Sequence, residues 1–503
     1  MTTIDQRSGV ARALTAAPIA SLAFVGILML TAIAVRDGLL GNDALRLWEG
    51  AATAADGEVP FGRIVAAYPT LPFLTTTLVA WLSSGGTPAP ALVAATLFAA
   101  VAAACFLSFR KAGYPLAVAV FFTLLIACHP ALLRAVIAGP GEMFLVVFML
   151  MLSLALYDLR LRSGTSEVMH VGLALMALAF SHPMGAAFAF ATVPFLAFAV
   201  SPTLVANSAL NVVVALVFPA LFAIGAFTYV SWIFPGDGWT FFAAPTESLS
   251  VWAVALVPVF GGMLANFPVL DACLAMTLAL MIGAPLVLAV LVLARRRRPL
   301  VDPAMVFAAA AIAATALSVL SGLFGDPAVI VVAAPVLSAA VVSRVPLVRG
   351  HIPLAVALLL AGWLGGLGSL ALVDPVTMSR LHLASQQAVS DRADALAAGG
   401  AVAADDGVLA DVDNAPAFLL GRGKTTGILG PQSEAFALAM LFGRVETPFV
   451  AVPDPQSRAG ANDRLDRAFP TLFRVGPPGY RIIYQNNTWR VFGKIKYLPP
   501  HKD

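Results

Sequence analysis

The stretch from Asp37 to Pro72 reads DGLLGNDALRLWEGAATAADGEVPFGRIVAAYPTLP, and it follows an apolar segment at residues 17 to 36. It holds five acids and two arginines, namely Asp37, Asp43, Glu49, Asp56, Glu58, Arg46 and Arg63. A segment this polar is unfavourable inside a bilayer, where charged side chains lose their hydration. We therefore expect residues 37 to 72 to form the first loop outside the membrane, with the rest of the chain arranged around it.

A short helix is predicted inside this loop, from Ala44 to Thr53, with Asp43 at its N-terminal edge. The pattern makes three apolar side chains available to rest on the membrane surface: Leu45, Leu47 and Trp48. Free backbone N–H groups at a helix start favour a carboxylate, which then stays ionised, as a general base must be. Asp43 is therefore the strongest catalytic candidate, and its structural alternative is a solvated helix cap.

The composition is that of a membrane protein. The 503 residues are 60% hydrophobic and 11% charged, with a mean hydropathy of +0.90. Since about 20 apolar residues cross a bilayer, we expect a polytopic α-helical membrane protein with about 11 to 13 transmembrane helices. The candidate segments are 17–36, 68–83, 88–109, 114–133, 141–160, 167–184, 185–200, 206–232, 270–294, 304–323, 328–343 and 352–373.

Basic residues orient these segments, because Lys and Arg are enriched in cytoplasmic loops. The clusters expected inside are Arg7 with Arg12, Arg110 with Lys111, Arg160 with Arg162, Arg295 to Arg298, and Arg344 with Arg349. An outer loop at 37–67 and an inner Arg110 allow only an odd number of crossings between them. The segment bracketed by prolines, 68–83, is therefore predicted to be interfacial or re-entrant.

A polar C-terminal domain is predicted from a shift in charge. Residues 1–373 carry 14 acids and 16 Lys and Arg, whereas residues 374–503 carry 13 acids and 14 Lys and Arg in about a third of that length. We expect a linker at 374–400 and a small extracytoplasmic α/β domain at 401–503. Strands are predicted at 408–410, 417–420, 449–452, 480–484 and 489–492, and helices at 433–442 and 462–469.

Ionisable residues gather in the predicted outer turns. His129 precedes the stretch from Arg134 to Glu142, and charged groups at membrane depth often mark a functional cavity. A guanidinium at Arg134 suits a phosphate, because it offers paired donors to two oxygens. The structural alternatives are a capping role for Glu142 and an Arg134 that extends to lipid headgroups.

Further binding candidates lie in the neighbouring loops. His182 is expected to bind a phosphate or a sugar together with His129, with an interfacial histidine as the alternative, and two histidines alone do not make a metal site. Asp237, between Trp232 and Trp239, and Asn42 and Tyr68 in the first loop complete the predicted substrate-binding set. Interfacial aromatic residues also occur in inert membrane proteins.

Several classes of function are disfavoured. The net charge of +3 shows no basic stripe with interleaved aromatics, so nucleic acid is not an expected partner. The three cysteines are isolated, which argues against a disulfide framework and a CxxC metal site. The chain contains no G-x-x-x-x-G-K-[ST], G-x-S-x-G or H-E-x-x-H motif, so an ATP-driven machine or a common hydrolase is not expected.

The first loop resembles the start of the GT-C superfamily of integral-membrane glycosyltransferases, which includes the protein O-mannosyltransferases and the bacterial lipid A aminoarabinose transferases. The resemblance covers roughly residues 15–200 and rests on Gly41 to Ala51 (GNDALRLWEGA), Gly57 to Phe61, Tyr68 to Pro72, His129-Pro130 and Gly141-Glu142. Where the family often has two adjacent acids and Pro-Pro-Leu, this chain has Asn42-Asp43 and Pro69-Thr70-Leu71.

The resemblance implies an inverting transfer of a sugar from a polyprenyl-phosphate donor in the membrane to a glycan, lipid or protein acceptor outside. Asp43 would be the general base, and His129, Arg134 and His182 would contact phosphate, with Glu142 on the acceptor side. The resemblance leaves open whether a divalent cation acts as a cofactor, and it does not identify the metal. The expected location is a bacterial inner membrane, with the N-terminus cytoplasmic and the C-terminal domain periplasmic.

Two other functions remain open from the sequence. One is a transporter or flippase for a lipid-linked saccharide, although the paired halves of many transporters are not visible. The other is a noncatalytic membrane subunit of a polysaccharide assembly, which would bind a protein partner through the C-terminal domain.

Overall fold

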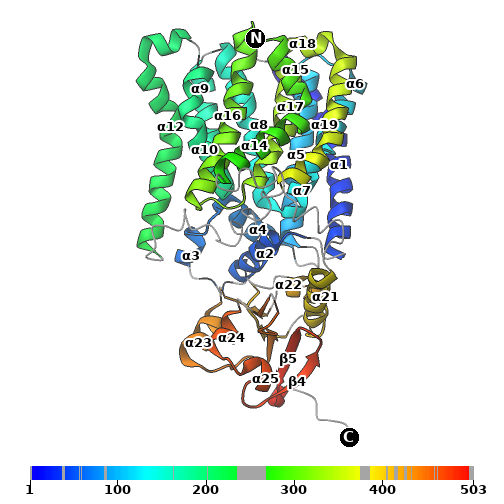
Figure 1. The fold of residues 1–503 in the computed structure, drawn as a ribbon, viewed down its shortest axis with the longest axis vertical. Helices are drawn as coiled ribbons and strands as arrows, with labels where there is room; N and C mark the ends of the chain where they lie inside the picture. The colour runs from blue at the N-terminus through cyan, green and yellow to red at the C-terminus, as the bar shows by residue number, and fades with distance from the viewer. Residues whose placement is uncertain are drawn as a thin grey trace.

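The computed structural model describes residues 3–36, 40–55, 57, 59, 61–83, 88–162, 164–200, 202–234, 268–373, 386–403, 406–412, 417–423, 427–431, 433–457, 459–460 and 463–497. A helical bundle forms one end of the molecule, and a smaller α/β unit forms the other (Figure 1). Three short helices lie between these two parts: α2 (Asn42–Ala55), α3 (Phe61–Val65) and α4 (Thr70–Leu82).

Seven helical segments among the described residues are long and apolar enough to cross a membrane. They lie in α1 (Thr3–Arg36), α5 (Ala89–Lys111), α8 (Pro140–Arg162), α12 (Pro202–Ile233), α16 (Arg298–Ser321), η2 with α17 (Pro327–Val332 and Ala333–Arg344) and α19 (Ile352–Val373). Two bent pairs raise the number to as many as nine: α6 (Leu116–Ala127) with α7 (Pro130–Ala138), and α14 (Pro268–Gly283) with α15 (Pro285–Leu293). The fold is that of a polytopic helical membrane protein.

Some predicted segments form shorter helices. They are α4, α9 (Thr165–Ser181), and α10 (Pro183–Thr192) continued by η1 (Val193–Phe195) and α11 (Leu196–Ala199), while α18 (Pro346–Gly350) joins α17 to α19. The 13 residues of α4 extend about 20 Å, less than the ~30 Å of a bilayer core. One side of α4 packs on α2 and α5, and an apolar row stays exposed: Leu74, Leu78, Trp81 and Leu82. That amphipathic arrangement is typical of an interfacial helix.

Histidine-proline pairs begin two helices of the bundle. The Nδ1 atom of His129 accepts a hydrogen bond from the Ala131 amide at 3.2 Å, and Nδ1 of His182 accepts one from the Met184 amide at 3.0 Å. The proline that follows each histidine suits the first helical position, where no backbone N–H is needed. Each imidazole therefore caps a helix, α7 or α10, and carries its own proton on Nε2 when neutral.

The α/β unit contains a five-stranded sheet in the order β2-β1-β3-β5-β4. The strands are β1 (Val408–Leu409), β2 (Ile428–Leu429), β3 (Phe449–Pro453), β4 (Tyr480–Gln485) and β5 (Trp489–Lys494). Strand β1 pairs in parallel with β2 and β3, whereas β5 pairs antiparallel with β3 and β4. The helices are α21 (Gln386–Gly400), α22 (Ala417–Arg422), α23 (Glu434–Phe442), α24 (Arg464–Ala468) and α25 (Leu472–Val475), followed by η4 (Ile495–Tyr497).

One of the predicted strands is wrong. Residues 417–420 lie in the helix α22, because a four-residue apolar run of Ala, Phe and Leu fits a helix as well as a strand. The other four predicted strands are confirmed as β1, β3, β4 and β5, and the predicted helix at 433–442 is confirmed as α23. The two-residue strand β2 gave no pattern long enough to predict.

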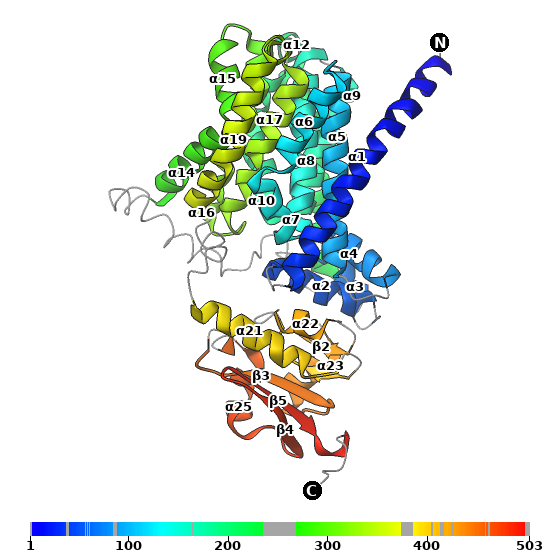
Figure 2. The ribbon, with the colours of Figure 1, turned by 90° about the vertical axis from the view of Figure 1, so that its right-hand side faces the viewer.

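The environment predicted for α2 is also wrong. Leu45 and Trp48 are not laid on a membrane surface; they are 0% and 5% exposed and belong to the same apolar core as Phe418 and Trp489 of the α/β unit. Figure 2 shows α2 on the side of the bundle that faces α22. The sequence pattern marks an apolar helix face but does not identify what covers it.

Candidate functional site

The start of α2 lies directly against the turn between α7 and α8. The Gly41 amide donates a hydrogen bond to the Ile137 carbonyl at 3.0 Å. Gly139, with φ of +120°, has no room for a side chain, because a Cβ there would lie 2.7 Å from the Cβ of Ala44. This close backbone approach fixes Asp43 beside the end of the bundle from which α8 begins.

Asp43 is in the first turn of α2, and its side chain is 83% exposed. Its Oδ1 atom lies 3.7 Å from Nη1 of Arg46. The helix N-terminus favours the negative charge, and the exposure leaves the carboxylate open to a group arriving from outside the bundle. The position agrees with the predicted edge of the helix.

Arg134 and Glu142, predicted separately, form a pair. Nη1 of Arg134 lies 2.5 Å from Oε2 of Glu142, and the two side chains are 11% and 9% exposed. Arg134 is on α7, whereas Glu142 is in the first turn of α8. Gly139 separates the two helices, and the change of direction there brings the charges together, so that each compensates the burial of the other.

His182 joins this group from the turn between α9 and α10. A Cβ on Gly141 would lie 3.3 Å from Cδ2 of His182, which places the imidazole over the α7–α8 turn. The charges of Asp43 and Arg134 both act on the imidazole. Since Nδ1 of His182 accepts the Met184 amide, the neutral ring offers Nε2–H as a donor.

His129 is held elsewhere. It is 4% exposed and begins α7, whereas the contact with α2 is at the other end of that helix. The backbone of Gly283 and Gly362 lies beside its imidazole, in a small cavity at the break between α14 and α15. The structure therefore does not bring His129 and His182 together.

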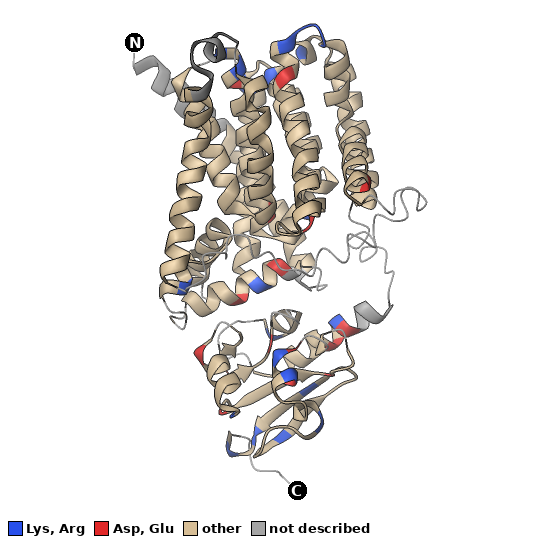
Figure 3. Cartoon of the chain, turned by 60° about the vertical axis from the view of Figure 1, so that its left-hand side comes forward, with Lys and Arg blue, Asp and Glu red and all other residues tan. Residues whose placement is uncertain are grey.

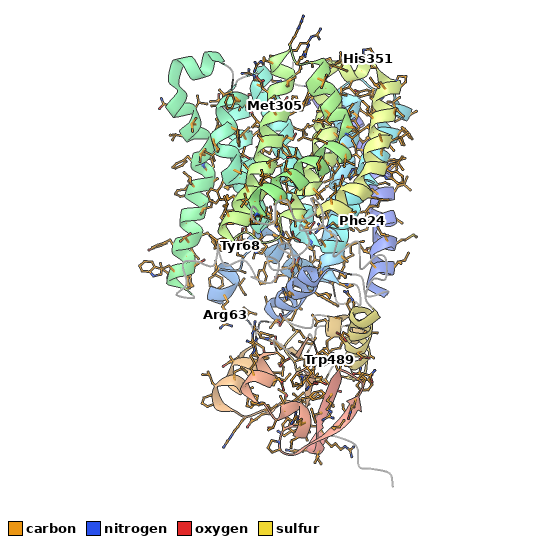
Figure 4. The ribbon with its side chains drawn as sticks, in the orientation of Figure 1. Phe24, Arg63, Tyr68, Met305, His351 and Trp489 are labelled. Carbon is orange, nitrogen blue, oxygen red and sulfur yellow. The ribbon has the colours of Figure 1, made fainter. Side chains whose placement is uncertain are left out.

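Tyr68 has a structural contact. Its hydroxyl donates a hydrogen bond to the Ala179 carbonyl at 2.9 Å, and its ring packs against Phe227. The bond ties the connection between α3 and α4 to the end of α9, three residues before His182. Figure 4 shows Tyr68 at the end of the bundle nearest the α/β unit.

Two predicted residues lie outside these contacts. Asn42 begins α2, but its side chain is outside the described part of the chain, and Asp237 lies wholly outside the described residues. Four predicted residues thus come together, from four elements of the fold: Asp43, Arg134, Glu142 and His182. The sequence alone did not reveal that Arg134 and Glu142 are paired, although a Gly-Pro-Gly turn between two opposite charges is a signal for such a contact.

No protein-family model and no curated protein matches this chain. The described residues hold no group of three or more His, Cys, Asp and Glu side chains that could hold a metal ion.

Proposed function

We propose that this chain is a membrane-embedded glycosyltransferase, which moves a sugar from a polyprenyl-phosphate donor to an acceptor hydroxyl outside the cytoplasm. The observation that carries the proposal is the exposed Asp43 carboxylate, which lies near the half-buried His182 and the largely buried pair of Arg134 with Glu142. The two substrates of such a transfer are suited by a base that is open to the acceptor and by two hydrogen-bond donors nearer the bundle, the Arg134 guanidinium and the His182 imidazole.

Each residue has a role in this proposal. Asp43 takes the proton of the acceptor hydroxyl, whose oxygen forms a bond to the anomeric carbon. The bond between that carbon and the phosphate oxygen breaks, and its electron pair leaves with the polyprenyl phosphate. The Arg134 guanidinium and the His182 Nε2–H stabilise the charge that develops on this phosphate. Glu142 orients Arg134.

The distribution of charge supports an extracytoplasmic site. In Figure 3, Lys and Arg residues (blue) gather at the end of the bundle away from the α/β unit. Clusters of basic residues are typical of the cytoplasmic side of a membrane protein. In this orientation the N-terminus is cytoplasmic, and α2 and the α/β unit are outside. If α9 and the helices from Pro183 to Ala199 cross as well, the number of crossings rises to eleven.

Buried ion pairs at the opposite end of the bundle favour a transferase over a transporter. There Arg160 pairs with Asp302 and Arg344 with Asp158, each at 2.6 Å and largely buried. These pairs join α8 to α16 and α17. A transporter must open that end in each cycle, whereas a transferase with an outer site has no such need.

The test is a donor-release assay on the purified protein. The protein in lipid nanodiscs is incubated with a panel of polyprenyl-phosphate-sugars and acceptor glycans, and free polyprenyl phosphate and product are measured. Asp43→Asn should lose at least about 100-fold in turnover, while its melting temperature stays that of the wild type. Equal turnover in the two proteins would exclude Asp43 as the base.

A further inference from the structure

The α/β unit is bonded to the residues that precede Asp43. Nη2 of Arg392, on α21, donates a hydrogen bond to the Leu40 carbonyl at 2.8 Å. The next residue, Gly41, donates its amide to Ile137 of the bundle. Two consecutive residues are thus tied to two different parts of the molecule, and Asp43 follows two positions later.

A shared apolar core reinforces this connection. Leu40, Ala44 and Leu45 are at most 1% exposed, and they lie in one cluster with residues of α21, α22 and the sheet: Ala395, Ala398, Val408, Phe418 and Trp489. Figure 4 shows Trp489 inside the α/β unit. The apolar face of α2, which starts next to Asp43, is therefore covered by the α/β unit and not by lipid.

The middle of α2 meets the same unit. Glu49 is 1% exposed, and a Cβ on Gly430 would collide with its carboxylate. The absence of a side chain at Gly430 permits this approach, whereas Gly400 has no comparable restriction, since a Cβ there would meet only the Gly421 carbonyl at 3.5 Å. The contact runs from Leu40, two residues before α2, to Glu49 in the middle of that helix.

The helix that carries Arg392 is itself anchored. The side-chain Nδ2 of Asn486 donates a hydrogen bond to the Asp394 carbonyl at 2.9 Å, and the Thr488 hydroxyl donates one to Oδ2 of Asp394 at 3.0 Å. Asn486 and Thr488 form the turn between β4 and β5. The sheet thus holds α21, and α21 holds the Leu40 carbonyl.

We propose that the α/β unit positions the general base, with Arg392 as the positioning residue that fixes the start of α2 relative to the bundle. The inference rests on the proposed function, because it assigns Asp43 as the base. It gives the α/β unit a role in turnover that does not require it to touch either substrate.

Two measurements test the role of Arg392 on the full chain in nanodiscs. The first is hydrogen exchange of the backbone amides in residues 42–47, which should be at least about 10-fold faster in Arg392→Ala. The second is steady-state kinetics with the polyprenyl-phosphate-sugar that the wild type uses. Because misplacing a catalytic group by about 1 Å costs on the order of 100-fold, kcat should fall roughly 10- to 100-fold while KM for the donor stays unchanged.

Matched variants separate positioning from folding. Arg392→Lys retains a donor for the Leu40 carbonyl and should recover most of both properties, and Arg444→Ala, at an exposed position of the same unit, should resemble the wild type. Gly430→Ala should repeat the effect of Arg392→Ala, unlike Gly400→Ala. Unchanged exchange in Arg392→Ala and Gly430→Ala, or faster exchange with unchanged kcat, would overturn the inference. A wild type without transfer activity would instead refute the proposed function, and the exchange data would still decide whether Arg392 holds α2.

Discussion

Arg160 and Asp302 form a buried ion pair at the end of the bundle opposite the candidate site, with 2.6 Å between Nη2 and Oδ2. Their side chains are 11% and 12% exposed, and Arg160 also donates to the Val200 carbonyl. The pair joins α8 to α16 and to the end of α11. Buried charges in such a position are costly unless they are paired, so both residues matter to the packing of the bundle.

Arg160→Ala should therefore destabilise the protein by about 3–5 kcal/mol, because it leaves the Asp302 carboxylate buried without its guanidinium. The measurement is thermal or denaturant unfolding in detergent micelles. Arg162→Ala is the matched control, since Arg162 is exposed two residues further along the same helix. Adding Asp302→Asn to Arg160→Ala should restore part of the loss. If Arg160→Ala unfolds like Arg162→Ala, the pair does not stabilise the bundle.

Gly139→Ala tests the close approach of α2 and α7. The new Cβ would lie 2.7 Å from that of Ala44, and a φ of +120° is strained for any residue with a side chain. We expect a loss of about 2–4 kcal/mol in stability, together with reduced turnover, because Asp43 is displaced. Gly225→Ala on α12, with open space around it, should have neither effect.

A buried carboxylate in the α/β unit predicts a pH dependence of stability. Asp463 is 1% exposed and caps α24 by accepting the Asp466 amide at 2.8 Å. The pKa of Asp463 is raised from the usual 3.8 to about 7, chiefly by burial and also by the charges of Asp411 and Asp466, while the hydrogen bonds from the Asp466 and Leu465 amides act to lower it. Between pH 3.8 and about 7, the Asp463 carboxyl therefore stays protonated in the folded protein, whereas it is ionised in the unfolded chain.

Stability should accordingly fall as the pH rises from about 4 to 7, and then level off. Asp463→Asn keeps a capping oxygen but removes the charge, so this contribution should vanish from its unfolding profile. The variant should be more stable than the wild type by on the order of 4 kcal/mol at pH 7.5 and by only about 1 kcal/mol at pH 4.5. A constant difference between the two proteins over this pH range would contradict the assignment.

The sequence predicts the bundle better than it predicts the site. Long apolar runs such as α5 and α16 are recognisable because the bilayer sets their length, and the charge pattern indicates that α4 is not an ordinary crossing. The first-loop pattern likewise places Asp43 at a helix start. What covers α2 was missed, since Leu45 and Trp48 look equally suited to lipid or to a second protein core.

The grouping within the site depends on contacts that are distant in sequence. His182 reaches the α7–α8 turn because α9 and α10 meet there, and no local pattern near His182 encodes that approach. His129 shares the same His-Pro motif but lies at the other end of α7, so the motif predicts the helix start and not the neighbours of the imidazole. The ends of elements were predictable here, and their mutual placement was not.

Arg134 offers the most specific test of the phosphate-binding role. Lysine at this position would keep the positive charge beside Glu142 but would lose the planar fork that binds two phosphate oxygens. We expect Arg134→Lys to lower kcat/KM for the polyprenyl-phosphate-sugar by about 10- to 100-fold, corresponding to about 1.4–2.8 kcal/mol of transition-state stabilisation. Because the ion pair with Glu142 can persist, the melting temperature should fall only slightly.

The control for this substitution is Arg63→Lys. Arg63 is exposed on α3, and Figure 4 shows it on the side of the bundle that faces the α/β unit, so a general effect of losing one guanidinium there would appear in both variants. The salt dependence of KM for the donor adds a second comparison, because a buried guanidinium is screened less than an exposed one. If Arg134→Lys turns over the donor as fast as Arg63→Lys, the guanidinium of Arg134 serves the packing of α7 and α8, and the proposed phosphate-binding role of Arg134 is wrong.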